Sequence, residues 1–153
     1  MSVYKCKHFK IDELVCNHVL SYYKNQDQLW SFLDENLKKT IDIIREILGV
    51  PLIINQHGAG HHQRGMRCHL CDLVTTNLSP YISTHMQGKA ADLILSSEAN
   101  MTAEQARHRI EQSSVKLPCN IRFEHNQNGK PITWIHVDVR DNPQNKKVYW
   151  FDV

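Results

Sequence analysis

The sequence contains no long hydrophobic run, although 41% of its 153 residues are hydrophobic. A transmembrane helix needs about 20 consecutive, mainly apolar residues, and no segment comes near that length. Residues 1–8 also lack the apolar core of a secretory signal peptide. We therefore expect no membrane insertion, and we expect synthesis in the cytoplasm without a signal peptide.

A strong charge of one sign is also missing, and so is an even set of cysteines. The formal net charge of +2 is too small to indicate a nucleic-acid partner. Five cysteines are an odd number, which without a secretory signal argues against a disulfide framework. The chain is long enough for one hydrophobic core and too short for two. We expect residues 1–153 to form a single domain and a monomer.

Hydrophobic spacing predicts one long helix. Apolar residues recur every three or four positions over residues 29–48, which is typical of an amphipathic helix of about five turns. Gly49 is expected to end this helix, and Pro51 prevents it from continuing. A capping-box pattern at residues 102–105 predicts a smaller helix that ends near Gln112.

Several short segments have the composition of strands, and Asn128-Gly129 is a strong hairpin-turn signal. The predicted fold class is α+β, a single domain with a central, mostly antiparallel sheet of about five strands, one long helix and one or two smaller helices. The expected strands cover residues 52–54, 90–95, 120–126, 132–139 and 147–151.

Two histidines and one aspartate have the spacing of an open zinc site. His85 and Asp92 stand on either side of Gly88, which allows a sharp turn, so their side chains can converge. His136 lies in an alternating segment and would supply a third ligand from another strand. Taken singly, each residue is more often an ordinary core histidine or turn carboxylate than a metal ligand. Together they form a typical ligand set for zinc with one position open to water.

The pattern Ser-x-His-x-x-Gly-x-Ala-x-Asp over residues 83–92, followed by His-x-Asp at 136–138, resembles the M15 family of zinc peptidases. This family includes D-alanyl-D-alanine carboxypeptidases and phage endolysins that cut peptidoglycan stem peptides. It shares a fold with the hedgehog signalling domain. The resemblance runs, with gaps, from about residue 9 to residue 140. It implies a hedgehog/DD-peptidase-like fold and one Zn²⁺ ion, with His85, Asp92 and His136 as ligands.

Two further side chains are expected to support these ligands. Asp138 lies on the same face of the predicted strand as His136, so it can hydrogen-bond that ligand. An ion pair between Asp138 and Arg140 is the alternative. Ser83, the first residue of the motif, is assigned the same supporting role.

A zinc peptidase also needs a base that accepts a proton from the attacking water. Much of the M15 family has a Glu or Asp three residues before the last His ligand, but this chain has Thr133 there. The hedgehog domain has a Glu further upstream, and that resemblance points to Glu124. A simple two-residue turn would pair Glu124 with Thr133 and face it away from His136, whereas a bulge would reverse this. The alternatives are His125, Asp138 or no base at all.

Arg67 stands where M15 enzymes have a Ser-Gly-Tyr-Arg phrase, of which only Gly65 and the arginine are present. The resemblance implies that this arginine is part of the catalytic site and orients the substrate by its carboxylate, a task that suits a planar guanidinium. The alternative is an ordinary surface arginine.

A Cys-x-x-Cys pair, Cys68 and Cys71, lies in a loop-rich segment that also contains several histidines. Together with His57 and either His61 or His62, the pair has the ligand types of a closed, structural zinc site. The alternative is two reduced thiols on a histidine-rich loop. The M15 resemblance implies no such site.

The function implied by the resemblance is that of a zinc metallopeptidase, a hydrolase that degrades the cell wall by cleaving a D-Ala-D-Ala or related bond of peptidoglycan stem peptides. A bacteriophage endolysin released from the host cytoplasm, or a virion-associated enzyme, is expected. One alternative is a catalytically inactive, zinc-stabilised binding or virion structural module on the same fold. The other alternative is a hydrolase that acts on another small amide.

Overall fold

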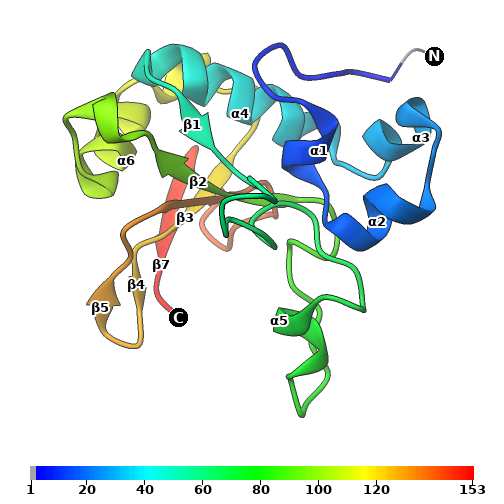
Figure 1. The fold of residues 1–153 in the computed structure, drawn as a ribbon. Helices are drawn as coiled ribbons and strands as arrows, with labels where there is room; N and C mark the ends of the chain where they lie inside the picture. Colours follow the sequence, from blue (N-terminus) through cyan, green and yellow to red (C-terminus); the bar gives the residue numbers. More distant parts are fainter. Residues whose placement is uncertain (1–2) are drawn as a thin grey trace.

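A five-stranded mixed sheet forms the centre of the computed structural model, which describes residues 3–153 (Figure 1). The strands lie in the order β1, β2, β6, β3, β7, and three of the four pairings are antiparallel, while β3 and β7 run parallel. The prediction of a mostly antiparallel sheet is therefore confirmed. The strands are β1 (Leu52–Ile53), β2 (Ala90–Leu95), β3 (Ile121–Glu124), β6 (Ile135–Asp138) and β7 (Val148–Phe151).

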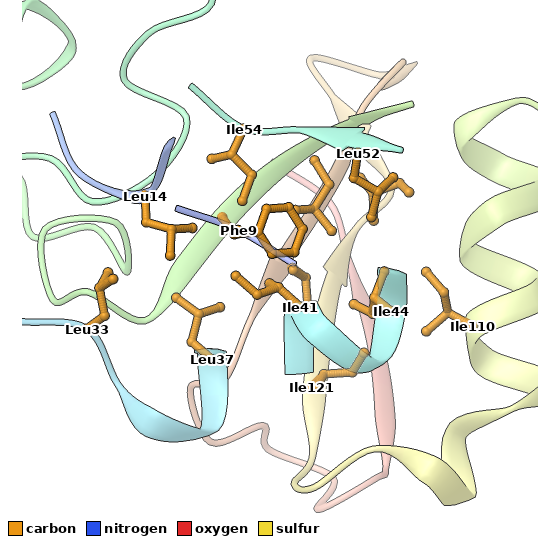
Figure 2. Close-up of a cluster of buried hydrophobic side chains, with 14 of the residues drawn as sticks. Phe9, Leu14, Leu33, Leu37, Ile41, Ile44, Leu52, Ile54, Ile110 and Ile121 are labelled. Carbon is orange, nitrogen blue, oxygen red and sulfur yellow. The ribbon is translucent and has the colours of Figure 1, made fainter. Parts of the chain in front are cut away.

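One face of the sheet carries the hydrophobic core beneath the helices α4 (Glu35–Leu48) and α6 (Ala103–Gln112). Ile44 of α4, Ile110 of α6 and Ile121 of β3 are fully buried there (Figure 2). Side chains alternate along a strand. The neighbours of these apolar residues along the strands therefore point to the opposite face, which carries polar groups. This arrangement confirms the α+β class.

The long helix predicted over residues 29–48 is in fact two helices, α3 (Gln26–Ser31) and α4. The Asp34 side chain caps the N-terminus of α4 and so starts a new helix at that point. The Asp34 backbone N–H donates to the carbonyl of Gly88 at 2.9 Å. The break is thus stabilised by a segment far away in the sequence. The predicted end is confirmed, because Gly49 adopts the left-handed conformation with φ 71°.

Smaller helices are more numerous than the one or two predicted. α6 begins at the predicted capping box, where Thr102 and Gln105 each accept a hydrogen bond from the other's backbone N–H. The others have six residues or fewer, too short to show a helical period in the sequence. No helix within residues 3–153 is both long and apolar enough to cross a membrane. The remaining helices are α1 (Ile11–Leu14), α2 (Asn17–Tyr22), α5 (Asp72–Thr75) and the 3₁₀ turns Ser97–Ala99 and Ser114–Lys116.

The predicted turn at Asn128-Gly129 joins two short strands, β4 (Asn126–Gln127) and β5 (Lys130–Pro131). Beyond it the register shifts. Gln127 pairs with Lys130 and Phe123 pairs with Val137, but the segment from Lys130 to Val137 is three residues longer than the segment from Phe123 to Gln127. An odd insertion moves the following side chains to the other face of the sheet.

A buried arginine supports the inserted segment. Arg107 of α6 is fully buried, and its Nη1 donates to the carbonyl of Trp134 at 2.8 Å. Its Nη2 donates to Glu104 at 2.6 Å, so the guanidinium is held from both sides. The irregular segment before β6 is therefore stabilised by the neighbouring helix.

Candidate metal centre

Three potential ligand side chains converge on the polar face of the sheet. Asp92 of β2 lies directly opposite His136 of β6 in the strand register, which places both side chains on the same face. His136 Nδ1 lies 2.8 Å from Asp92 Oδ1, and His85 Nε2 lies 3.5 Å from the same oxygen. All three side chains are buried. The structure thus brings together the three residues that the sequence singled out, in a cluster that could hold a metal ion.

Hydrogen bonds set the orientation of both imidazoles. His85 Nδ1 lies 2.8 Å from the carbonyl of Gly65, which can only accept, so Nδ1 carries the proton and the Nε2 lone pair faces Asp92. His136 Nε2 lies 3.3 Å from Asp138 Oδ2, which leaves Nδ1 facing Asp92. Histidine ligands usually donate their second N–H in this way. The arrangement therefore fits a cation bound by two nitrogens and one oxygen.

The three groups have strongly shifted pKa values. Burial lowers the pKa of His85. Burial by itself would also lower the pKa of His136, but hydrogen bonds to Asp138 and Asp92 outweigh it and raise that pKa to about 9. Burial would raise the pKa of Asp92, yet the two imidazoles hold it well below its usual range. The carboxylate therefore stays ionised and attracts either a proton on His136 or a metal cation.

The turn that carries His85 depends on Gly88. This glycine has φ 66°, and a Cβ at this position would meet the carbonyl oxygen of Phe32 at the α3–α4 junction. Within the turn, Ser83 Oγ accepts from the backbone N–H of Met86 at 3.3 Å. Ser83 therefore supports the turn, and its hydroxyl makes no hydrogen bond to the ligand side chains of the described chain.

Asp138 lies within hydrogen-bond distance of His136, and its ionic partner is Arg122, not Arg140. Its carboxylate accepts two hydrogen bonds from Arg122, from Nε at 2.7 Å and from Nη2 at 2.9 Å. Arg140 contributes only its backbone N–H, at 3.0 Å. Asp138 is fully buried. It is therefore positioned to orient His136, and it has no freedom to act as a base.

Glu124 lies on the same face of the sheet as the three ligands. Because Arg122 pairs with Asp138 and Phe123 pairs with Val137, the next residue of β3, Glu124, lies opposite His136. Its side chain is buried, and Oε1 has no hydrogen-bond partner among residues 3–153. Burial raises the pKa of Glu124. A buried carboxylate of this kind is well suited to accept and return a proton.

The other candidate base, His125, lies elsewhere. It lines a separate hollow together with Glu104 and Thr133, and its Nε2 is 3.6 Å from Glu104 Oε1. Glu124 lines the hollow that contains the ligands. The simple hairpin register is therefore wrong, because the insertion before β6 exchanges the faces of Glu124 and His125.

The ligands and Glu124 line one cleft of about 700 Å³. Arg67 is buried in its wall, where Nε donates to the carbonyl of Gln63 at 2.6 Å. Its Nη2 approaches Asp92 Oδ2 at 3.4 Å, and its Nη1 approaches the Tyr81 hydroxyl at 3.4 Å. Arg67 is thus not an ordinary surface arginine. Other cationic side chains that line the cleft are Arg64, Arg122 and Arg140.

A second cluster of potential ligands contains Cys68 and Cys71, but with partners other than those predicted. They meet Cys16 and His18, from the start of α2. His57 instead lies 2.9 Å from the carbonyl of Asp12 through Nε2. His61 is also outside the cluster, with its backbone carbonyl bonded to the N–H of Gln56. The Cys-x-His spacing at residues 16–18 was the signal in the sequence that could have identified these ligands.

Comparisons of this chain with protein-family models, with curated proteins and with solved structures find no match.

Proposed function

We propose that the chain is a zinc metallopeptidase of the hedgehog/DD-peptidase type that cleaves peptidoglycan stem peptides at a D-Ala-D-Ala or related bond. The observation that carries the proposal is the meeting, in one cleft, of three convergent ligand atoms and the unpartnered carboxylate of Glu124. Two imidazoles and one carboxylate suit zinc with a position left open. Delivery to the cell wall by a bacteriophage stays a prediction from the sequence resemblance.

The donor set fits zinc because each imidazole is oriented by its other nitrogen. Gly65 and Asp138 fix the rings so that His85 Nε2 and His136 Nδ1 both face Asp92. When bound there, zinc would polarise the scissile carbonyl and acidify the attacking water.

Glu124 would move the proton in this reaction. Its buried Oε1 has no partner in the described chain and lines the same cleft as the ligands. The carboxylate would accept a proton from the attacking water and pass it to the amine that leaves when the C–N bond breaks. Burial raises the pKa of Glu124, which makes its carboxylate a better proton acceptor.

Cationic side chains would orient the peptide. Arg67 Nη1 makes only a long contact to Tyr81, 3.4 Å, so it can turn toward a substrate carboxylate. Arg64 and Arg140 line the same cleft. A stem peptide that ends in a free D-Ala carboxylate would match this charge.

The substitution Glu124→Gln tests the proposal. Gln keeps the shape of the side chain but cannot accept the proton, so hydrolysis of purified cell wall should fall by roughly 10²–10⁴-fold. Zinc content and folding should be unchanged. Hydrolysis is measured by zymography and by release of D-Ala or stem-peptide fragments, with and without a chelator.

The double variant Glu124→Gln/Thr133→Glu is the matched control. A carboxylate at 133 would face the separate hollow near Glu104, so it should not restore activity. Rescue by this change would refute the assignment of position 133 to the separate hollow, whereas wild-type hydrolysis in Glu124→Gln alone would refute the role of Glu124. A wild-type protein that binds zinc but releases no fragment from any wall preparation would favour the inactive binding module instead.

A further inference from the structure

The second cluster joins two segments about 50 positions apart in the sequence. Cys68 Sγ lies 3.6 Å from His18 Nδ1, Cys71 Sγ lies 3.8 Å from the same nitrogen, and the two sulfurs are 4.0 Å apart. Cys16 Sγ completes a group whose ligand atoms all lie within 4.8 Å of one another. A disulfide needs an S–S distance of about 2.05 Å. The contacts are therefore those of free thiols around a common point.

These distances match the edges of a zinc tetrahedron. With Zn–S of about 2.3 Å and Zn–N of about 2.05 Å, a regular tetrahedron has S···S edges of about 3.8 Å and S···N edges of about 3.6 Å. We propose that Cys16, His18, Cys68 and Cys71 bind a second zinc ion that is structural. The three thiol protons are released to solvent when the metal binds.

The ligand set distinguishes this site from the centre on the sheet. Three thiolates and one imidazole fill all four positions of tetrahedral zinc, so no position remains for water or substrate. Soft thiolate ligands also favour zinc over magnesium or calcium. The site on the sheet, with two nitrogens and one oxygen, keeps a position open. The two ions would therefore have different tasks.

The backbone already holds the two halves of the cluster together. Val15 and Met66 form a parallel bridge. The N–H of Cys16 donates to the carbonyl of Met66 at 3.1 Å, and the N–H of Met66 donates to the carbonyl of Leu14 at 2.8 Å. These bonds place the Cys-x-His and Cys-x-x-Cys segments side by side before any ion binds. A preformed site of this kind loses little entropy on binding.

The segment after Cys71 has little hydrophobic core to stabilise it. α5 contains no buried residue. Leu78 and Ile82 of this segment are 105% and 71% exposed. In small, loop-rich regions a structural metal often replaces the missing core. The ion would therefore anchor the segment at its start.

This segment is also a wall of the cleft. Leu73 of α5 lines the cleft, and its N–H donates to the side chain of Gln63 at 2.9 Å. The carbonyl of Gln63 in turn accepts from Arg67. Because Arg67 directly precedes Cys68, the second ion would hold both the wall and this arginine in place.

Native mass spectrometry of the full chain after purification with zinc tests the inference. We expect two zinc ions in the wild type, one in Cys71→Ser and one in His18→Ala. The ligand His18 is exposed, so its removal leaves folding intact even where loss of a buried thiol does not. The controls are His57→Ala and Cys119→Ser, which alter residues outside the cluster and should retain two ions.

The variant His85→Ala separates the two sites. It should lose the ion on the sheet and keep the other, and its cobalt form should show thiolate-to-cobalt charge-transfer absorption. A His85→Ala protein without metal, or cobalt bound without that absorption, would overturn the inference. Absence of wall hydrolysis in the wild type, with the thiolate-bound ion present, would count only against the proposed peptidase.

Discussion

Asp138 would act on a metal ion in the candidate centre through His136, whose Nε2 lies 3.3 Å from its carboxylate. Its carboxylate is fully buried and is held by two hydrogen bonds from Arg122. Such a residue influences a metal in two ways, since it fixes the orientation of the ligand ring and increases its basicity. It also neutralises the guanidinium of Arg122, whose side chain is only 16% exposed.

Asp138→Asn is therefore expected to weaken both metal binding and folding. Affinity at the centre on the sheet should fall about 10–100-fold. Loss of one partner of a buried ion pair should reduce the free energy of unfolding by about 3–5 kcal/mol. Zinc competition titrations and urea unfolding of the metal-free protein measure the two effects. Arg140→Gln is the control, because Arg140 offers Asp138 only its backbone N–H.

The ionisation of Glu124 should appear as a pH-dependent stability. Burial raises the pKa of Glu124 in the folded protein above the value of about 4.3 that a Glu has in an unfolded chain. Below that value both states are protonated. As the pH rises through the folded pKa, the carboxyl group must ionise in a buried site, and the stability associated with its protonated form is lost.

We therefore expect metal-free Glu124→Gln to unfold at a higher temperature than the metal-free wild type at neutral pH. The difference should shrink toward pH 4, where the unfolded carboxyl is also largely protonated. Thermal unfolding of both proteins in the presence of a chelator, from neutral pH to pH 4, measures this difference in unfolding temperature. Glu98→Gln, at an exposed position, should follow the wild type. A difference that does not change with pH would contradict the expectation.

At the scale of elements, the turn that contains Gly88 leads into β2 and packs against the α3–α4 junction. It therefore links the helical part of the fold to the candidate metal centre. Gly88 adopts φ 66° and packs against the backbone of Phe32, while the N–H of Asp34 donates to the Gly88 carbonyl. The same contact breaks the helix and positions the turn that carries His85. The glycine of the motif is therefore also required for packing against the α3–α4 junction.

Gly88→Ala should destabilise the protein by roughly 2–5 kcal/mol, from the left-handed conformation together with the steric clash. Zinc at the sheet centre should be lost with it. Gly129→Ala is the matched control, because Gly129 has φ 74° but no atom of the described chain lies within 4 Å of the added Cβ. It should cost only about 1–2 kcal/mol. Urea unfolding and zinc content are measured for both variants. An equal loss of unfolding free energy in Gly88→Ala and Gly129→Ala would refute the packing argument.

The hairpin before β6 shows how one element determines the chemistry of another. The three inserted residues bring Glu124 to the face of His136, and the buried Arg107 of α6 holds the inserted segment through Trp134. The residue proposed as the base therefore depends on a helix that does not touch the cleft with any of its residues in the described chain.

At the scale of the whole molecule, two metal ions would stabilise different parts of one domain. An ion that binds only the folded state adds about 2.7 kcal/mol of stability at a free concentration 100 times its Kd. For a chain of this size each kcal/mol raises the unfolding temperature by about 2–4 °C. A chelator should therefore lower the unfolding temperature by about 5–10 °C for each occupied site.

The variant His85→Ala should keep only the part of this chelator effect that comes from the cysteine cluster, about half of the wild-type shift. Differential scanning calorimetry with and without chelator measures both proteins. An unfolding temperature that the chelator does not change in the wild type would contradict metal binding at either centre.

The sequence by itself determined the features that depend on neighbouring residues. The end of α4 at Gly49, the capping box of α6 and the Asn128-Gly129 turn follow from backbone preferences of a few residues, and all three are confirmed. The α+β class follows from hydrophobic periodicity. His85, Asp92 and His136 were identifiable because a motif with fixed spacing places their side chains on one turn and two paired strands.

Tertiary structure alone decided what depends on segments far apart in the chain. The contact of Gly88 with the α3–α4 junction breaks a helix that its own periodicity would continue. The partners of Cys68 come from the start of α2, not from the nearby His57. Glu124 faces the ligands because of an odd insertion that a helix stabilises. The physical reason is common to all three: local preferences differ by about 1 kcal/mol or less per residue, whereas buried contacts between distant segments contribute more and override them.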